Sequence, residues 1–410
     1  MTIQIRCIYN GCINHFFLRR LLTFTRPELK IILYCAKVEI DRSKIDLLKD
    51  LLQQKIDWEY LLLIARLHKV TPLIYVNLMK ICPEAVPQDI LNKLKQFIAA
   101  KTRRNLHLLR ELNELTAIFQ KNNIPAIPYK GLILAAEVYG DLSLRQFVDL
   151  DFLVARQNYS KAQELLIDRG YGVPSQKDVD WEKTFIHPQK QIAVDLHQGL
   201  TPPELPFYVD FPNLWQRLKP VSIGGVEVKS FSAEDLLIIL CVQLAKDSQW
   251  TAEVLIKVCD IAELLRAYQN IDWNLVWQRC TKLGTKRILL FSLYIANSLL
   301  ETKLPESIWQ KIQQDDIAKK AATQVCEELL LRSEKTFVER IFKERVFLRH
   351  LAKERWQDKF TYFITTTLIP NEEEFSLVSL PKPFFFLYYF VRPVRLSFKV
   401  LASIGSRKNS

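Results

Sequence analysis

Apolar side chains recur at helical spacing along the first third of the chain, from residue 27 to about residue 122. The clearest run contains Leu108, Leu112, Leu115 and Phe119. Because a helix turns once in about 3.6 residues, side chains three or four positions apart lie on the same face. The pattern therefore predicts an N-terminal helical domain over residues 27–122.

The pattern changes between residues 123 and 230, where short apolar runs are separated by turn residues. Runs of this kind predict strands with short helices between them. The expected strands cover 124–129, 147–154 and 191–197, a hairpin covers 221–228 around Gly224 and Gly225, and the expected helices begin at Gly131 and cover 159–169. We interpret residues 123–230 as an α/β domain.

Helical spacing returns after residue 231. The predicted helices cover 236–244, 254–267, 275–283, 287–300 and most of 308–353. The sequence thus predicts a predominantly helical α+β protein, in which a small mixed sheet is flanked by the N-terminal domain and by a C-terminal helical domain over 231–369. Residues 1–26 form a poorly specified N-terminal extension, and residues 370–410 form an aromatic and basic tail.

The positive charge of the chain is concentrated at its two ends. The formal net charge is +12, but four Lys or Arg residues precede the first acid, Glu28, and six follow the last acid, Glu374. Those ten charges leave about two for the interior (12 − 10). A nearly neutral interior predicts no basic groove and disfavours nucleic acid as a partner.

The cysteines and the apolar runs indicate the compartment. The eight cysteines are scattered and include no Cys-x-x-Cys pair, which argues against a zinc site and against a disulfide framework. The apolar runs are too short to cross a bilayer, and Arg19 and Arg20 interrupt the first of them, unlike a signal peptide. We therefore expect a cytoplasmic protein.

The strand expected over 147–154 carries two carboxylates, Asp149 and Asp151. Because side chains alternate along a strand, both acids project from one face and their apolar neighbours from the other. Adjacent like charges repel, and a hard divalent cation with oxygen ligands, such as Mg²⁺, would compensate them. The alternative is a half-exposed strand with two solvated acids.

A third carboxylate, Asp195, lies in the strand expected over 191–197, on the same face as His197. If that strand neighbours the first, Asp149 and Asp151 would ligate two metal ions for an in-line phosphoryl displacement. Asp195 would ligate one of these ions and assist deprotonation of an acceptor hydroxyl. His197 is expected to orient Asp195 or the acceptor, or else to be a hydrogen-bonded histidine at a strand end.

Lys130 and Gly131 lie where an expected strand meets a short helix, and Gly131 precedes Asp149 by 18 residues. A helix N-terminus attracts anions, glycine lets a phosphate approach the backbone, and lysine adds a positive charge. We expect both residues to contact a phosphate; the alternative is an ordinary turn. Arg145 is expected to bind a phosphate or a carboxylate bidentately.

Several motifs resemble a known family. They are Pro128-Tyr129-Lys130-Gly131, Tyr139-Gly140-Asp141, Arg145, Asp149-Leu150-Asp151-Phe152-Leu153-Val154, Arg169-Gly170-Tyr171 and Val194-Asp195-Leu196-His197. Their order resembles the polymerase-beta-like nucleotidyltransferase superfamily, in which a glycine-serine turn and a helix precede an Asp-x-Asp strand. More narrowly, they resemble the bacterial uncharacterised nucleotidyltransferase family, over most of residues 27–396. Leu132 departs from this pattern because it replaces the usual serine, and Lys130 could substitute for the missing hydroxyl.

The resemblance implies a Mg²⁺- or Mn²⁺-dependent enzyme. It would transfer a nucleoside monophosphate from an NTP to a hydroxyl of an unknown small-molecule or protein acceptor. Leu132 and the large helical flanks motivate an alternative, a catalytically silent nucleotide-binding or scaffolding module of the same fold. Template-free addition to RNA is a weaker alternative, because the interior is nearly neutral.

The tail concentrates aromatic residues over 384–390, followed by Arg392, Arg395 and Lys399. Prolines at positions 381, 383 and 393 limit any helix between them to about two turns. Two interpretations follow. The aromatic residues dock onto the protein's own helices, or residues 384–399 make a weak contact with a membrane surface, with the cations at the headgroups.

Overall fold

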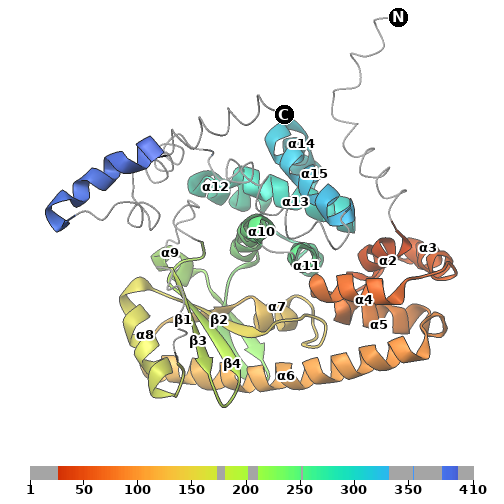
Figure 1. Cartoon of the computed structure of the whole chain (residues 1–410), viewed down its shortest axis with the longest axis horizontal. Helices are drawn as coiled ribbons and strands as arrows, with labels where there is room; N and C mark the ends of the chain where they lie inside the picture. The colour runs from red at the N-terminus through yellow and green to blue at the C-terminus, as the bar shows by residue number, and fades with distance from the viewer. Residues whose placement is uncertain are drawn as a thin grey trace, which may run out of the picture. The chain divides into compact units, whose positions relative to one another are not determined.

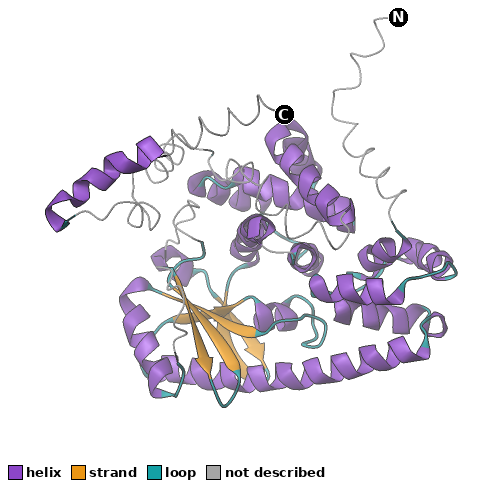
Figure 2. Cartoon of the chain, viewed as in Figure 1, coloured by secondary structure: helices purple, strands orange, loops and turns teal. Residues whose placement is uncertain are grey.

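The computed structural model describes residues 26–172, 181–201, 211–250, 253–331, 354 and 381–395. The chain divides into two compact units, Met1–Pro203 with Phe207–Ala352 and Glu204–Pro206 with Lys353–Ser410. The first unit is mostly helical with a small mixed sheet, which confirms the expected fold class (Figure 1, Figure 2). Parts of three predicted regions, namely residues 1–25 of the extension, 332–353 of the last helical run and most of the tail, lie outside the described residues.

The N-terminal part is helical, as its apolar spacing predicts. Its helices are α2 (Pro27–Cys35), α3 (Arg42–Leu52), α4 (Trp58–Leu67), α5 (Thr71–Ile81), the 3-10 turn η1 (Pro83–Ala85) and α6 (Gln88–Lys121). Asp57 accepts a hydrogen bond from the backbone N–H of Tyr60 at 3.0 Å and so caps the first turn of α4. The long helix α6 contacts α5 at one end and strand β1 (Ala126–Tyr129) at the other.

Four strands form the central sheet, in the order β1, β2 (Asp149–Val154), β4 (Ile192–His197) and β3 (Glu182–His187). Strands β2 and β4 are parallel, whereas β1 and β3 pair antiparallel at the two edges. Helix α7 (Gly131–Glu137) connects β1 to β2, and α8 (Arg156–Asp168) follows β2. Strand β3 was not predicted, because Phe185 is its only fully buried residue and its other positions are polar or partly exposed.

A separate hairpin and a short helix complete the α/β part. The hairpin pairs β5 (Lys219–Ile223) with β6 (Val226–Ser230), and α9 covers Phe211–Gln216. Gly224 and Gly225 have φ angles of 59° and 84°. A two-residue hairpin turn with positive φ at both positions requires residues such as glycine, which confirms the predicted turn.

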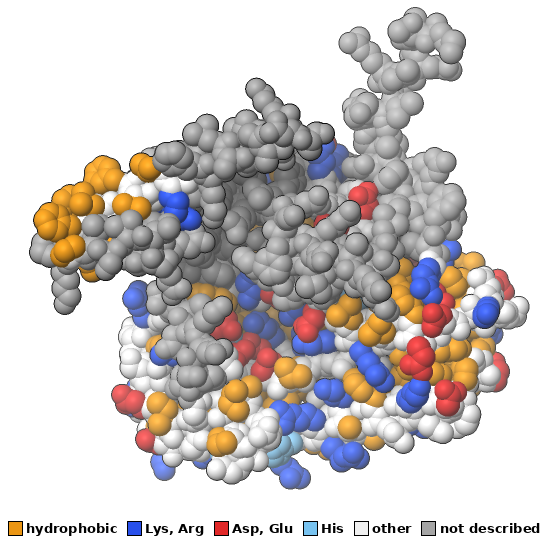
Figure 3. Space-filling view, in the orientation of Figure 1, with side chains coloured by type: hydrophobic (Ala, Val, Ile, Leu, Met, Phe, Trp, Pro, Cys, Tyr) orange, Lys and Arg blue, Asp and Glu red, His pale blue; other side chains and the backbone are white. Residues whose placement is uncertain are grey.

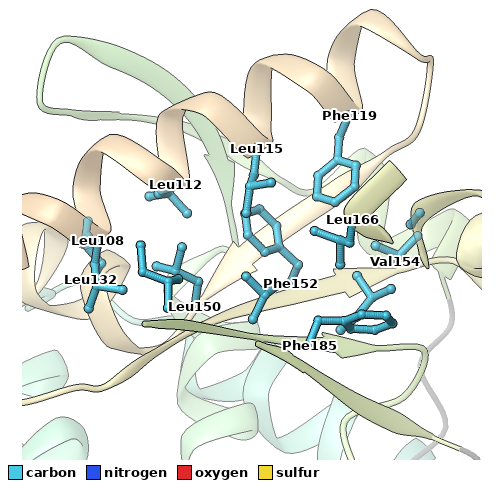
Figure 4. Close-up of a cluster of buried hydrophobic side chains, with 14 of the residues drawn as sticks. Leu108, Leu112, Leu115, Phe119, Leu132, Leu150, Phe152, Val154, Leu166 and Phe185 are labelled. Atoms are coloured by element: carbon cyan, nitrogen blue, oxygen red, sulfur yellow. The ribbon is translucent and has the colours of Figure 1, made fainter. Parts of the chain in front are cut away.

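One face of the sheet packs against the second half of α6 (Figure 4). Leu108, Leu112, Leu115 and Phe119 meet Leu150, Phe152 and Val154 in this core. The rings of Phe119 and Phe152 lie edge to face, with 5.3 Å between their centroids. Because these apolar side chains fill one face of β2, the carboxylates between them project from the other face.

The C-terminal part of the first unit is helical again. Its helices are α10 (Ala233–Trp250), α11 (Val254–Ala267), α12 (Trp273–Leu283), α13 (Lys286–Leu300), α14 (Glu306–Gln314) and α15 (Asp316–Leu331). Helices α10 and α11 lie on the side of the sheet opposite to α6 (Figure 1). Among the described helices, none is long and apolar enough to cross a membrane.

Both helical parts and the α/β part belong to the same compact unit. Helix α6 joins the first two parts, since its second half contributes to the core of the sheet. The division into domains at residues 122/123 and 230/231 stays a prediction.

Candidate functional site

The pairing of β2 with β4 brings the predicted carboxylates together. Asp151 is directly opposite Asp195, and Asp149 is opposite Ala193. One oxygen of Asp151, one oxygen of Asp195 and one ring nitrogen of His197 lie within 4.8 Å of one another. Asp149 is half-buried and lies two residues before Asp151, so its side chain projects from the same face.

Asp151 is the most tightly held of the three acids. Its Oδ1 atom accepts a hydrogen bond from Lys130 Nζ at 2.9 Å and lies 3.0 Å from His197 Nε2. Burial alone would raise the pKa of Asp151, but Lys130 and His197 hold that pKa well below its usual range. Asp151 is therefore a carboxylate at neutral pH, with both of these contacts made by a single oxygen.

Asp195 and Asp149 are affected in the opposite direction. Burial, followed by the charges of Asp151 and Asp149, raises the pKa of Asp195 to about 7. The Thr184 hydroxyl donates a hydrogen bond of 2.7 Å to Asp195 Oδ1. Burial and the charge of Asp151 also raise the pKa of Asp149. The repulsion between these acids is thus incompletely compensated by the protein.

This donor set fits a hard divalent cation. Mg²⁺ and Mn²⁺ prefer carboxylate oxygens, and three carboxylates lie on one face of two adjacent strands. Both Asp151 contacts use Oδ1, so its Oδ2 atom can turn toward an ion. A divalent ion would relieve the repulsion that raises the pKa of Asp195 and of Asp149.

His197 occupies a position that the sequence indicated only in part. Its ring is almost fully buried and contacts Asp151 rather than Asp195, while Nδ1 lies 3.5 Å from a carboxylate oxygen of Glu182. Burial, followed by the charge of Lys130, lowers the pKa of His197. The imidazole ring is therefore neutral at pH 7. Its location on the acid-bearing face follows from the two-residue spacing from Asp195, but its partner is decided by the strand register.

Lys130 and Gly131 form the junction between β1 and α7. Lys130 has an unusual backbone conformation for a non-glycine residue, with φ 61° and ψ −146°, and Gly131 has φ 24°. Strained backbone of this kind is typical of functional sites. The side chain of Leu132 is buried in the hydrophobic core, so no side-chain hydroxyl faces the site at this position. The contact of Lys130 and Gly131 with a phosphate stays a prediction.

Arg145 binds a carboxylate in this structure, which is one of its two expected partners. Its Nε and Nη2 atoms donate to the two oxygens of Asp260 in α11, at 2.8 and 2.7 Å. The Tyr139 hydroxyl donates to the same carboxylate at 2.8 Å. This buried group connects the loop before β2 to the C-terminal helices, and a contact between Arg145 and a phosphate stays a prediction.

The sequence did not reveal that two distant lysines, Lys69 and Lys257, act on the Asp149 carboxylate. Lys130, Lys69 and Lys257 each oppose the rise in the pKa of Asp149. Lys257 pairs with Asp247 at 3.2 Å and Lys69 with Glu253 at 2.6 Å, so each lysine has an acidic partner.

Lys246 is a further lysine of this region, and its charge interacts with that of Lys130. Its Nζ lies 5.0 Å from the ring centre of Trp181. Figure 3 shows Lys or Arg side chains next to acidic ones in the middle of the visible face. Lys69, Lys130 and Lys257 are far apart in the sequence, so counting charges along the chain could not detect that they lie close to one carboxylate.

The small mixed sheet thus presents clustered carboxylates beside a lysine. A family model described as "Uncharacterised nucleotidyltransferase" matches residues 54–301, and the chain belongs to this family. The match confirms the resemblance to the uncharacterised nucleotidyltransferase family, and it covers a narrower span than the expected residues 27–396.

Two further comparisons add less. No curated protein matches the sequence. The crystal structure of an antigenic nucleotidyltransferase-like protein from Paracoccidioides brasiliensis is similar over 50% of this chain and 97% of that chain, with 17% sequence identity and a TM-score of 0.31. A likeness at this TM-score carries no argument about the present protein.

Proposed function

We propose that this protein transfers a nucleoside monophosphate from an NTP to a hydroxyl group of an acceptor. The proposal depends on one observation above all, the register that sets Asp195 beside Asp151 on the polar face of the sheet. The family match supports the same class of reaction. Asp149, Asp151 and Asp195 would hold Mg²⁺ or Mn²⁺, which would offset the negative charge of the reacting phosphates.

The residues of the chain have distinct parts in this reaction. Asp195, which would also hold the ion, accepts the proton of the acceptor hydroxyl as the general base. The acceptor oxygen then bonds to the α-phosphorus, the bond from that phosphorus to the β-phosphate's bridging oxygen breaks, and pyrophosphate leaves. Neutral His197 holds Asp151 in position throughout.

The lysines around the carboxylates suit a triphosphate. Lys130 is buried, and Asp151 raises its pKa although burial by itself would lower it, so it carries a full positive charge. Lys69 and Lys257 add positive charge on the side of Asp149. When ATP or another NTP binds with its metal ion, these lysines would leave their acidic partners and bind phosphate oxygens.

Metal-dependent transfer from an α-labelled NTP to a fraction of cell extract tests the proposal. We expect wild-type protein to label an acceptor with Mg²⁺ present, and Asp149→Asn to lower labelling by about 100-fold or more. The matched control is Asp168→Asn, which changes an exposed acid of α8. Equal labelling by Asp149→Asn and by wild-type protein would contradict the proposal.

A catalytically silent nucleotide-binding module is the second candidate. Two observations favour it: Leu132 replaces the usual hydroxyl, and Lys130 already neutralises Asp151 without a metal ion. Calorimetry with ATP and Mn²⁺ separates the candidates. Tight binding without turnover on any acceptor would favour the silent module over the enzyme.

Metal affinity is expected to increase as the pH rises from 6 to 8. The pKa of Asp195 is raised to about 7, so below pH 7 a proton must leave before this carboxylate can ligate a cation. Affinity for Mn²⁺ should be about 10-fold higher at pH 8 than at pH 6. Calorimetric titration in buffers with different ionisation enthalpies would also count the released protons, and Asp195→Asn should remove the dependence. An affinity that is constant over this range would disprove the assignment.

A further inference from the structure

Large apolar side chains gather on the surface of the second unit. Thirteen large apolar side chains of the described residues are exposed, and six of them fall within residues 384–394, with exposed fractions of 46–67%. We call these six residues the aromatic face: Phe384, Phe385, Phe386, Tyr389, Phe390 and Val394. Single exposed apolar residues are normal, but a contiguous cluster marks a binding surface.

The backbone holds this cluster in a regular arrangement. Lys382–Leu387 forms the 3-10 helix η2, and residues 388–395 are helical. Phe390 and Val394 are four positions apart and so lie on the same side of the helix. Tyr388 is buried, and its ring packs edge to face against that of Phe385, with 5.7 Å between the centroids. In Figure 3 the segment shows a patch of hydrophobic side chains with Lys or Arg side chains beside it.

The residues that follow the last acid of the chain, Glu374, carry charge of a single sign. Residues 375–410 contain six Lys or Arg residues and no Asp or Glu, and Arg392 and Arg395 lie in the helical segment itself. A second copy of the chain would bring two such cationic segments together, and their repulsion disfavours self-association. A surface with negative charge and an adjacent apolar layer complements both features.

We propose that the aromatic face binds the surface of a bilayer that contains anionic lipids. The aromatic rings of Phe386 and Phe390 insert at the boundary between headgroups and acyl chains, and the helical segment that carries Arg392 and Arg395 lies among the headgroups. This binding brings the nucleotidyltransferase part of the chain to a membrane surface. It does not depend on nucleotidyl transfer.

Co-sedimentation of the full chain with lipid vesicles tests this proposal. Vesicles of phosphatidylcholine alone are compared with vesicles that also contain phosphatidylserine. We expect binding to the anionic vesicles to be about 10-fold stronger or more, and to weaken as salt is added. The double variant Phe386→Ser/Phe390→Ser should bind them about 10-fold more weakly than wild type.

A matched control separates the aromatic face from general hydrophobicity. Leu63→Ser/Ile167→Ser changes two other exposed apolar side chains, in α4 and α8, with similar exposed fractions of 45% and 50%. This control should bind like wild type, and all variants should keep the wild-type thermal transition.

Three results would overturn the proposal. They are no binding to anionic vesicles, equal binding to both kinds of vesicle, and an equal loss in the control variant. The aromatic face could instead bind a second copy of the chain, which sedimentation velocity would detect. A self-associated species that disappears in Phe386→Ser/Phe390→Ser would overturn the lipid assignment.

Discussion

Replacing Asp195 with asparagine is expected to lower the rate of nucleotidyl transfer by about 100- to 10,000-fold while stabilising the metal-free protein. The loss follows because asparagine can neither accept the hydroxyl proton nor supply an anionic metal ligand. The hydrogen bond from Thr184 can be kept, since the asparagine carbonyl also accepts. The variant should therefore be folded and catalytically impaired.

The gain in stability has a definite sign and pH range. The pKa of Asp195 is raised to about 7 in the folded protein, so the fold favours the protonated form. Stability contributed by this group is present at low pH and is lost as the pH rises from about 4 through 7. Asparagine removes that loss, so the free energy of unfolding should exceed that of wild type by about 1–3 kcal/mol at pH 8, and by little at pH 4.

Chemical denaturation without metal ions, together with the labelling assay, measures both effects. Asp168→Asn in α8 is again the matched control and should change neither quantity. A variant that transfers label within about tenfold of wild type would remove Asp195 from the mechanism. A variant that is less stable than wild type at pH 8 would mean that the acids do not repel one another in the folded protein.

Replacing Asp260 with alanine should have the largest effect on stability. Asp260 and Arg145 are 1% and 5% exposed, and they form a bidentate ion pair that also receives the Tyr139 hydroxyl. Removing the carboxylate leaves a buried guanidinium without a partner. We expect the free energy of unfolding to fall by about 3–5 kcal/mol, as for other broken buried ion pairs.

Two further variants test this explanation by denaturant unfolding. Arg145→Met/Asp260→Leu removes both charges and should be more stable than Asp260→Ala alone, because no charge is then left buried without a partner. Glu59→Ala breaks the exposed pair with Lys93, whose side chains are 71% and 46% exposed, and should lower stability by less than about 1 kcal/mol. If Asp260→Ala resembled Glu59→Ala, the buried pair would not stabilise the link between the sheet and α11.

The regular elements with strong apolar periodicity could be predicted from the sequence. Residues 254–267 form α11 with the expected bounds, and the strand expected over 191–197 is β4, Ile192–His197. In both cases the period of burial is set by local backbone geometry. Strand β3 was missed because an edge strand buries few side chains and so leaves little alternation in the sequence.

The surroundings of the carboxylates could be predicted less well. Arg145 was expected to bind either a phosphate or a carboxylate. It binds the Asp260 carboxylate because α11 packs against the loop that carries Arg145. His197 was expected to orient Asp195 or the acceptor, or to be a hydrogen-bonded histidine at a strand end, and the structure places its Nε2 atom 3.0 Å from Asp151 Oδ1. Lys69 and Lys257 belong to a stretch of the sequence that is nearly neutral overall, yet both act on the Asp149 carboxylate. Contacts between residues so distant in sequence depend on packing, which no local pattern encodes.

The sequence by itself determined that Asp149, Asp151 and Asp195 would each project from the polar face of its strand, because side chains alternate along any strand. The tertiary structure decided that the strands of Asp151 and Asp195 are parallel neighbours, since pairing between strands is fixed by the core beneath them. It also decided which cations surround the acids and therefore their protonation. A pKa depends on burial and on charges within a few ångströms, and both are set only when separate segments pack together.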